Sequence, residues 1–132
     1  MDFEEINDTT RIYSDDNDKK YEFRIDEDEI AVYITYLGTS EVIGEFEFIE
    51  VGEYGYKTTF EGYKLRYMDV KDGYKRNGLG TAAVEFFKEF YGEPIIVSSY
   101  NGMERADGSH LTGEGLPFAM RLLELGIIDY EN

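Results

Sequence analysis

The sequence predicts a single α+β domain built on a mixed, mostly antiparallel sheet that contains one β-α-β unit. The chain of 132 residues is long enough for one hydrophobic core and leaves no room for a second domain. Alternating apolar residues dominate the first 70 positions, and the apolar spacing then changes to the helical period over residues 79–91. A β-branched run at residues 95–99 follows that helix, as expected for a parallel crossover.

The elements can be placed in order along the chain. Residues 1–20 are acidic and their structure stays open, with a turn or mobile loop at residues 14–18. Strands are expected at residues 21–25, 30–37, 41–51 and 63–70, because these segments are rich in β-formers and are separated by Asp- and Gly-containing turns. Gly92 and Gly126 supply stop signals for helices predicted at residues 79–91 and 117–125.

Composition limits the classes of function. The net charge is −16, and residues 1–30 carry 12 acidic and 4 basic side chains. Such a surface repels phosphate backbones, so no nucleic-acid partner is expected. The chain has no cysteine, which removes disulfides, thiolate metal sites and a cysteine nucleophile, and we expect no metal. No segment resembles a signal peptide or a membrane span, so we expect a cytoplasmic protein with no membrane partner.

The turn before the first predicted helix carries the clearest functional signal. It contains Gly78 and Gly80, and glycines allow a backbone to approach a ligand closely. The first N–H groups of a helix lack partners within the helix and lie at the positive end of its dipole. Residues 77–81 therefore predict a phosphate-binding site, and the basic residues between 57 and 76 surround it with positive charge.

Residues 70–81, Val-Lys-Asp-Gly-Tyr-Lys-Arg-Asn-Gly-Leu-Gly-Thr, resemble the acetyl-CoA signature of the GNAT superfamily of N-acetyltransferases, Val-x-x-x-Tyr-(Arg/Gln)-x-x-Gly-x-(Gly/Ala). The resemblance extends more loosely over residues 63–127, about half of the chain. It implies a GNAT-like domain in which helix N–H groups bind the pyrophosphate and the sheet edge binds pantetheine. The cofactor-binding residues that it implies are Met68, Asp69, Val70, Lys75, Arg76, Asn77, Gly78, Leu79, Gly80, Thr81 and, after the strand at 95–99, Asn101.

The chain departs from the family where catalysis would occur. Leu122 stands at the position of the usual catalytic tyrosine, residues 102–115 form an insertion, and the two helices that normally follow the first strand are not found. The candidates for proton transfer are therefore His110, Glu114 and Tyr100. His110 could equally be a surface residue or a wall of the acceptor pocket. Glu114 could instead favour the positive end of the following helix.

Three functions follow as hypotheses. The first is acetyl-CoA-dependent N-acetyltransfer by direct attack of a cationic amine, such as a polyamine, an aminoglycoside or a lysine-bearing protein. The second is a CoA-binding relative without catalysis, and the third is a small acidic protein that imitates nucleic acid to block a basic partner. An incomplete sheet could pair with a second copy, and the 12 tyrosines could serve that surface or fill the core, so the sequence favours a homodimer.

Overall fold

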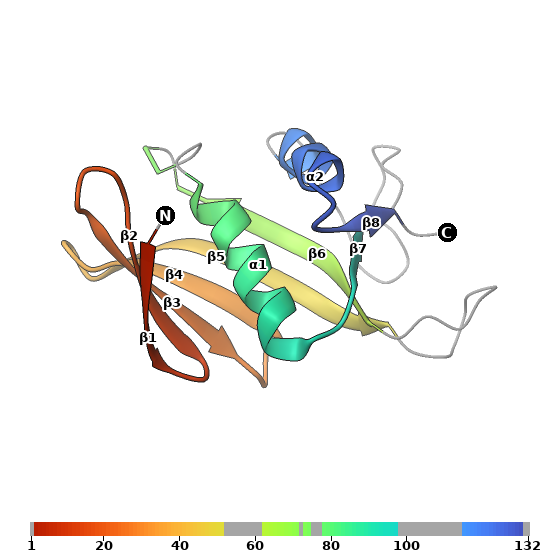
Figure 1. Ribbon diagram of the computed structural model, residues 1–132, viewed down its shortest axis with the longest axis horizontal. Coiled ribbons are helices and arrows are strands. Elements are labelled where there is room, and N and C mark those ends of the chain that lie inside the picture. Colours follow the sequence, from red (N-terminus) through yellow and green to blue (C-terminus); the bar gives the residue numbers. More distant parts are fainter. Residues whose placement is uncertain (1, 52–61, 72, 75–77, 98–114, 131–132) are drawn as a thin grey trace.

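A computed structural model describes residues 2–51, 62–71, 73–74, 78–97 and 115–130. These residues form one curled sheet of eight strands, in the spatial order β1 to β8, and two helices (Figure 1). The strands are β1 (Asp2–Asn7), β2 (Thr10–Ser14), β3 (Lys20–Asp26), β4 (Ala31–Tyr36), β5 (Glu41–Val51), β6 (Gly62–Val70), β7 (Ile95–Val97) and β8 (Asp129–Tyr130). The helices are α1 (Leu79–Tyr91) and α2 (Gly115–Glu124).

The sheet has two parts with different connections. Strands β1 to β6 form an antiparallel meander in which each strand pairs with the next. Strand β6 pairs in parallel with β7, and β7 pairs in parallel with β8, so α1 and α2 are the two crossover connections. A parallel pair needs a long connection, which explains why both helices lie in the second half of the chain.

Helix α1 lies across one face of the sheet and covers the core (Figure 1). Phe87 stacks on Phe48 of β5 with ring centroids 3.7 Å apart, and Tyr63 of β6 meets the Phe87 ring edge-on at a centroid distance of 5.1 Å. Burial of each such aromatic side chain stabilises the fold by roughly 1.5–3 kcal/mol. The helix ends at Gly92, whose left-handed backbone (φ 66°) lets its N–H donate to the Lys88 carbonyl at 2.9 Å.

The prediction of a GNAT-like α+β fold is wrong. Strands account for 49% and helices for 21% of the structure, and the described residues contain two helices only. Part of the cause lies in residues 2–14, whose structure the sequence left open: they form β1 and β2 and extend the sheet beyond β3, which is the strand expected at 21–25. The side chains Tyr13 of β2 and Tyr21 and Phe23 of β3 are buried in the hydrophobic core. The fold is therefore β-rich.

The individual elements were predicted better than the class. The helix expected at residues 79–91 is α1, the strand expected at 63–70 is β6, and its parallel pairing with the following strand is confirmed. The second helix begins at Gly115, two residues earlier than expected, and ends before Gly126, whose φ is 74°. The acidic segment at residues 1–20, left open from the sequence, contains a hairpin of β1 and β2.

Candidate functional site

The first feature of the site is the start of α1. The N-cap residue Gly78 has a left-handed backbone (φ 84°) and, having no side chain, makes no capping hydrogen bond. The first turn contains no acidic side chain. Neither the N-cap nor the first turn of α1 thus places a negatively charged side chain at the positive end of this helix.

The second feature is the end of β6. On one side this strand pairs with β5 as far as Val70, opposite Gly44. On the other side it pairs with β7 only at Tyr63 and Lys64. Within the described residues, the stretch Met68–Val70 therefore has no neighbouring strand on its β7 side. Backbone N–H and C=O groups of such a stretch are able to pair with an extended ligand.

Gly80 has a packing role that the sequence did not reveal. A Cβ atom at this position would lie 2.8 Å from Cε1 of Phe118 on α2 and 3.3 Å from Cζ of Phe46 on β5. The missing side chain allows α2 and β5 to approach α1 closely. The expectation that Gly80 is glycine so that its backbone can meet a phosphate is therefore not required by the structure.

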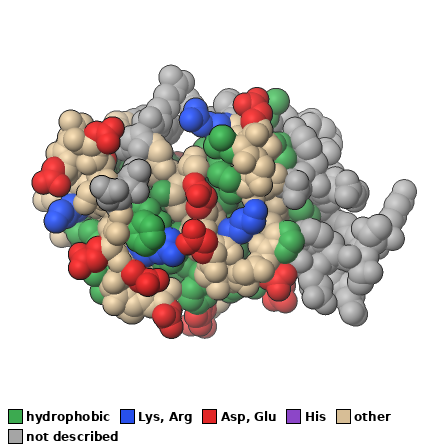
Figure 2. Space-filling model, in the orientation of Figure 1, with side chains coloured by type: hydrophobic (Ala, Val, Ile, Leu, Met, Phe, Trp, Pro, Cys, Tyr) green, Lys and Arg blue, Asp and Glu red, His purple; other side chains and the backbone are tan. Residues whose placement is uncertain are grey.

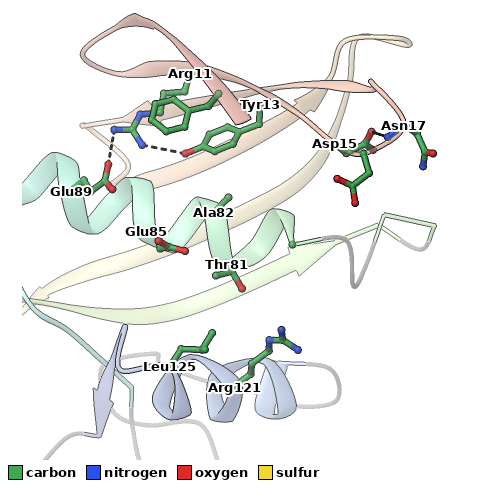
Figure 3. Close-up of a pocket in the computed structure, with 13 residues that line it drawn as sticks. Arg11, Tyr13, Asp15, Asn17, Thr81, Ala82, Glu85, Glu89, Arg121 and Leu125 are labelled. Carbon is green, nitrogen blue, oxygen red and sulfur yellow. Dashed lines mark hydrogen bonds and ion pairs between the residues drawn. The ribbon is translucent and has the colours of Figure 1, made fainter. Parts of the chain in front are cut away.

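A groove of about 580 Å³ runs over the outward side of α1 (Figure 3). Its floor is α1, one wall is the β1–β2 hairpin with the turn that follows it, and the other wall is α2. The groove reaches the start of α1 at Gly78 and Thr81. The lining residues are Phe3, Arg11, Tyr13, Asp15, Asp16, Asn17, Gly78, Thr81, Ala82, Glu85, Glu89, Arg121 and Leu125.

Arg11 is the most enclosed charged group of the groove. Its guanidinium lies between the rings of Phe3 and Phe86, 4.3 and 4.4 Å from their centroids. It donates to the Tyr13 hydroxyl at 3.2 Å and to the Glu89 carboxylate at 2.6 Å. Burial acts to lower the pKa of Arg11, but these two hydrogen bonds outweigh it and raise the pKa. Arg11 stays charged, and Glu89 neutralises it.

The turn between β2 and β3 is held by Asp15. Its carboxylate accepts hydrogen bonds from the backbone N–H groups of Asn17 (2.8 Å) and Lys19 (2.9 Å) and from the Tyr21 hydroxyl (3.1 Å). Desolvation opposes the charged form, yet these hydrogen bonds lower the pKa of Asp15. Asp15 is therefore a carboxylate at neutral pH and fixes this wall of the groove.

The groove has an acidic balance. Among the described residues, four carboxylates line it, against two guanidinium groups, and one of those is already paired. Arg121 faces the remaining acids from α2. Acidic side chains also outnumber basic ones over the face of the molecule that carries α1 (Figure 2). This groove favours a cationic ligand over an anionic one.

The structure describes some of the site residues predicted from the sequence and not others. Lys75, Arg76, Asn77 and Asn101, together with the catalytic candidates Tyr100, His110 and Glu114, lie outside the described residues. Within them, Val70 and Leu79 are core residues, 8% and 1% exposed. Met68 is half-buried against the core, and the side chain of Asp69 is exposed. Gly78 and Thr81 line the groove.

Two further positions of the GNAT resemblance have structural roles. Tyr74, the tyrosine of the signature, packs against Tyr36 and Tyr21 at centroid distances of 5.6 and 6.4 Å. Leu122, at the position of the usual catalytic tyrosine, is fully buried. A side chain there belongs to the core beneath α2 and does not face a site.

Sequence reasoning missed the hairpin wall of the groove. Arg11 and Tyr13 alternate within a five-residue strand, but Ile12 between them blurs the pattern. The usable signal was Asp15 followed by Asp16 and Asn17, since Asp and Asn often accept hydrogen bonds from the backbone two residues ahead.

Neither helix of the described part of the chain has the length and hydrophobicity to cross a bilayer. The described residues likewise contain no group of three or more acidic or histidine side chains arranged to hold a metal ion. Comparison of the chain with protein-family models, with curated proteins and with solved structures finds no match.

Proposed function

We propose that the protein transfers an acetyl group from acetyl-CoA to a cationic amine. Two observations carry the proposal: within the described residues, Met68–Val70 of β6 has no neighbouring strand on its β7 side, and the N-cap residue of α1, Gly78, makes no side-chain capping hydrogen bond. The two features are adjacent, because Gly80 of α1 lies against Phe46, the β5 residue that pairs with Met68. The proposal does not depend on the fold class.

The donor would occupy these two features together. Backbone groups of Met68–Val70 are suited to hydrogen-bond the amide groups of pantetheine as an added strand would. The start of α1 is suited to the pyrophosphate, since its first turn contains no acidic side chain and the positive end of a helix dipole attracts anions.

The acceptor would occupy the acidic groove. Glu85 lies one helical turn beyond Thr81, so a carboxylate sits on the groove floor next to the donor end of α1. An ammonium group held there is drawn by the net negative charge of the lining. This supports polyamine-like acceptors over neutral ones.

The reaction would be a direct transfer. The amine, after loss of one proton, attacks the thioester carbonyl carbon; the new C–N bond forms and the C–S bond breaks. The electron pair of the C–S bond leaves with sulfur as a thiolate, which takes up a proton, and the attacking nitrogen loses a second proton to give the neutral amide. The described residues contribute mainly by holding the two substrates together, which removes much of the entropic barrier.

Donor binding can be tested with Thr81→Glu. A glutamate in the first helical turn favours α1 itself, so the variant should fold, while its charge should repel the pyrophosphate. The matched control is Asn7→Asp, which adds one negative charge in the β1–β2 turn and can keep the hydrogen bonds to Thr9. We expect acetyl-CoA at 100 times its Kd to stabilise the wild type and the control by about 2.7 kcal/mol, seen as a higher Tm. An absent shift in the wild type at millimolar acetyl-CoA, or a retained shift in Thr81→Glu, refutes the donor site.

Transfer itself can be followed with a thiol reagent. The protein has no cysteine, so every thiol detected comes from released CoA. With spermidine as the probe, Glu85→Gln should raise KM for the amine and change kcat little. Donor binding without thiol release from any amine would identify a CoA-binding protein that does not catalyse transfer.

A further inference from the structure

The face of the sheet opposite α1 carries an ordered set of carboxylates and tyrosines. The side chains along β3 to β6 point alternately to the two faces of the sheet, so the residues between the core positions point to the face opposite α1. One row crosses four strands in register, from Arg24 through Tyr33 and Glu45 to Asp69. In the next row Glu47 pairs with Tyr67. We call Tyr33, Glu45, Glu47, Tyr67 and Asp69 the acidic sheet face.

These groups are accessible in the structure. Tyr67 is 42% exposed and Asp69 is exposed, while Tyr33, Glu45 and Glu47 are partly exposed. Helices α1 and α2 do not cover them, because α1 packs on the face that carries Phe46 and Phe48. Tyrosine and glutamate here form a surface that combines aromatic rings with negative charge.

The charges on this face repel one another. Glu45 and Asp69 are directly opposite across β5 and β6, and like charges in that position destabilise a sheet. Burial, followed by the charges of Glu47 and Asp69, raises the pKa of Glu45. A bound cation would relieve this repulsion.

Local arginines neutralise this face only in part, because Arg66 forms an ion pair with Glu47. Arg66 lies 3.9 Å from Glu47, and Arg24 lies over the Tyr33 ring at 5.3 Å. Within the described part of the chain, neither Glu45 nor Asp69 forms an ion pair. The face therefore keeps unneutralised carboxylates beside exposed aromatic rings.

We propose that the acidic sheet face binds an arginine-rich segment of a protein partner in an extended conformation. A guanidinium group can bind a carboxylate through two hydrogen bonds and stack on a tyrosine ring, so it fits both kinds of residue on this face. Glu45 and Glu47 are two positions apart on one strand, a spacing of about 6.6–6.8 Å. An extended peptide presents alternate side chains at the same spacing.

The test uses two labelled nine-residue peptides of identical composition, one alternating arginine and serine and one in the order Arg-Arg-Ser-Ser-Arg-Arg-Ser-Ser-Arg, in which no two arginines are two positions apart. Fluorescence anisotropy at fixed ionic strength measures their Kd. We expect the alternating peptide to bind more tightly, since only it can place arginines opposite both glutamates. Equal affinity for the two peptides, or no binding of either, overturns the proposal.

The matched variants are the pairs Glu45→Gln with Glu47→Gln and Glu4→Gln with Glu5→Gln. Both remove two negative charges, the first from the acidic sheet face and the second from β1. The first pair should weaken binding of the alternating peptide by roughly 5- to 30-fold, and the second by less than about twofold. Equal losses in the two double variants would show that net charge alone attracts the peptide and would overturn the site.

The first double variant should fold, because it removes repelling charges, and its Tm should be no lower than that of the wild type. Tyr67→Leu gives a second readout that leaves every charge in place. It should weaken the alternating peptide severalfold through loss of ring stacking, and an unchanged Kd would remove the tyrosine from the proposed surface.

Discussion

The close contact between α1 and α2 at Gly80 can be tested by Gly80→Ala. The backbone of Gly80 is helical, so alanine needs no unusual conformation there. Its methyl group, however, would meet Phe118 at 2.8 Å and Phe46 at 3.3 Å, inside the separation of about 3.5–4.0 Å at which carbon atoms pack. Overpacking costs about 1–3 kcal/mol, and alanine recovers about 0.5–1 kcal/mol of helix propensity relative to glycine. We therefore expect a net loss of about 1 kcal/mol.

A double-mutant cycle separates packing from propensity. Phe118→Leu keeps an apolar side chain but removes the ring atoms that a Cβ at position 80 would meet most closely. In the Phe118→Leu background, Gly80→Ala should leave the free energy of unfolding unchanged or raise it slightly. This corresponds to a coupling energy between the two positions of about 1 kcal/mol or more. Urea unfolding of the four proteins, followed by far-UV circular dichroism, measures each free energy. Identical effects of Gly80→Ala in the two backgrounds would refute the packing role of Gly80.

Three other predictions concern stability. Phe87→Ala should lose about 3–5 kcal/mol in urea unfolding, because it removes a buried ring stacked on Phe48; a loss under 1 kcal/mol would contradict that packing. Burial and a neighbouring carboxylate raise the pKa of Tyr21 to about 12 from its ordinary value of 10.0. Between these two pKa values the folded protein keeps a proton that the unfolded chain releases. The free energy of unfolding should therefore keep its full value below pH 10 and fall between about pH 10 and 12, and Tyr21→Phe should show a smaller fall. Glu89→Ala leaves the enclosed guanidinium of Arg11 without its charged partner and should cost about 1–3 kcal/mol, more than Arg11→Met; the reverse order in thermal unfolding would contradict this account.

The candidate site shows where sequence reasoning stopped. Residues 77–81 were singled out from two glycines and a change of period, and the structure puts Gly78 and Thr81 at the end of a groove. The same reasoning assigned Gly80 to ligand approach, whereas its nearest neighbour is Phe118, 38 positions away in the chain. Glycine spacing alone does not distinguish these two causes, since both require the same missing side chain.

The acidic N-terminal segment shows a second limit. Its charge made a mobile segment a reasonable expectation, but Tyr13 is 5% exposed and Arg11 is 9% exposed. Arg11 is buried only because Phe3 on β1 and both Phe86 and Glu89 on α1 surround its guanidinium. No periodicity within residues 1–20 reports such partners.

The amino-acid sequence by itself determined the local elements from β3 through β6 and α1 to β7. Their signals are short in range: alternation for the strands, a 3.6-residue spacing for α1 and a left-handed glycine at its end. Only the tertiary structure decided that β1 and β2 join the same sheet, that α1 packs against α2 at Gly80, and that three distant segments enclose one acidic groove. The reason is physical, because pairing partners and side-chain contacts between distant segments depend on the assembled core and leave no fixed period in the chain.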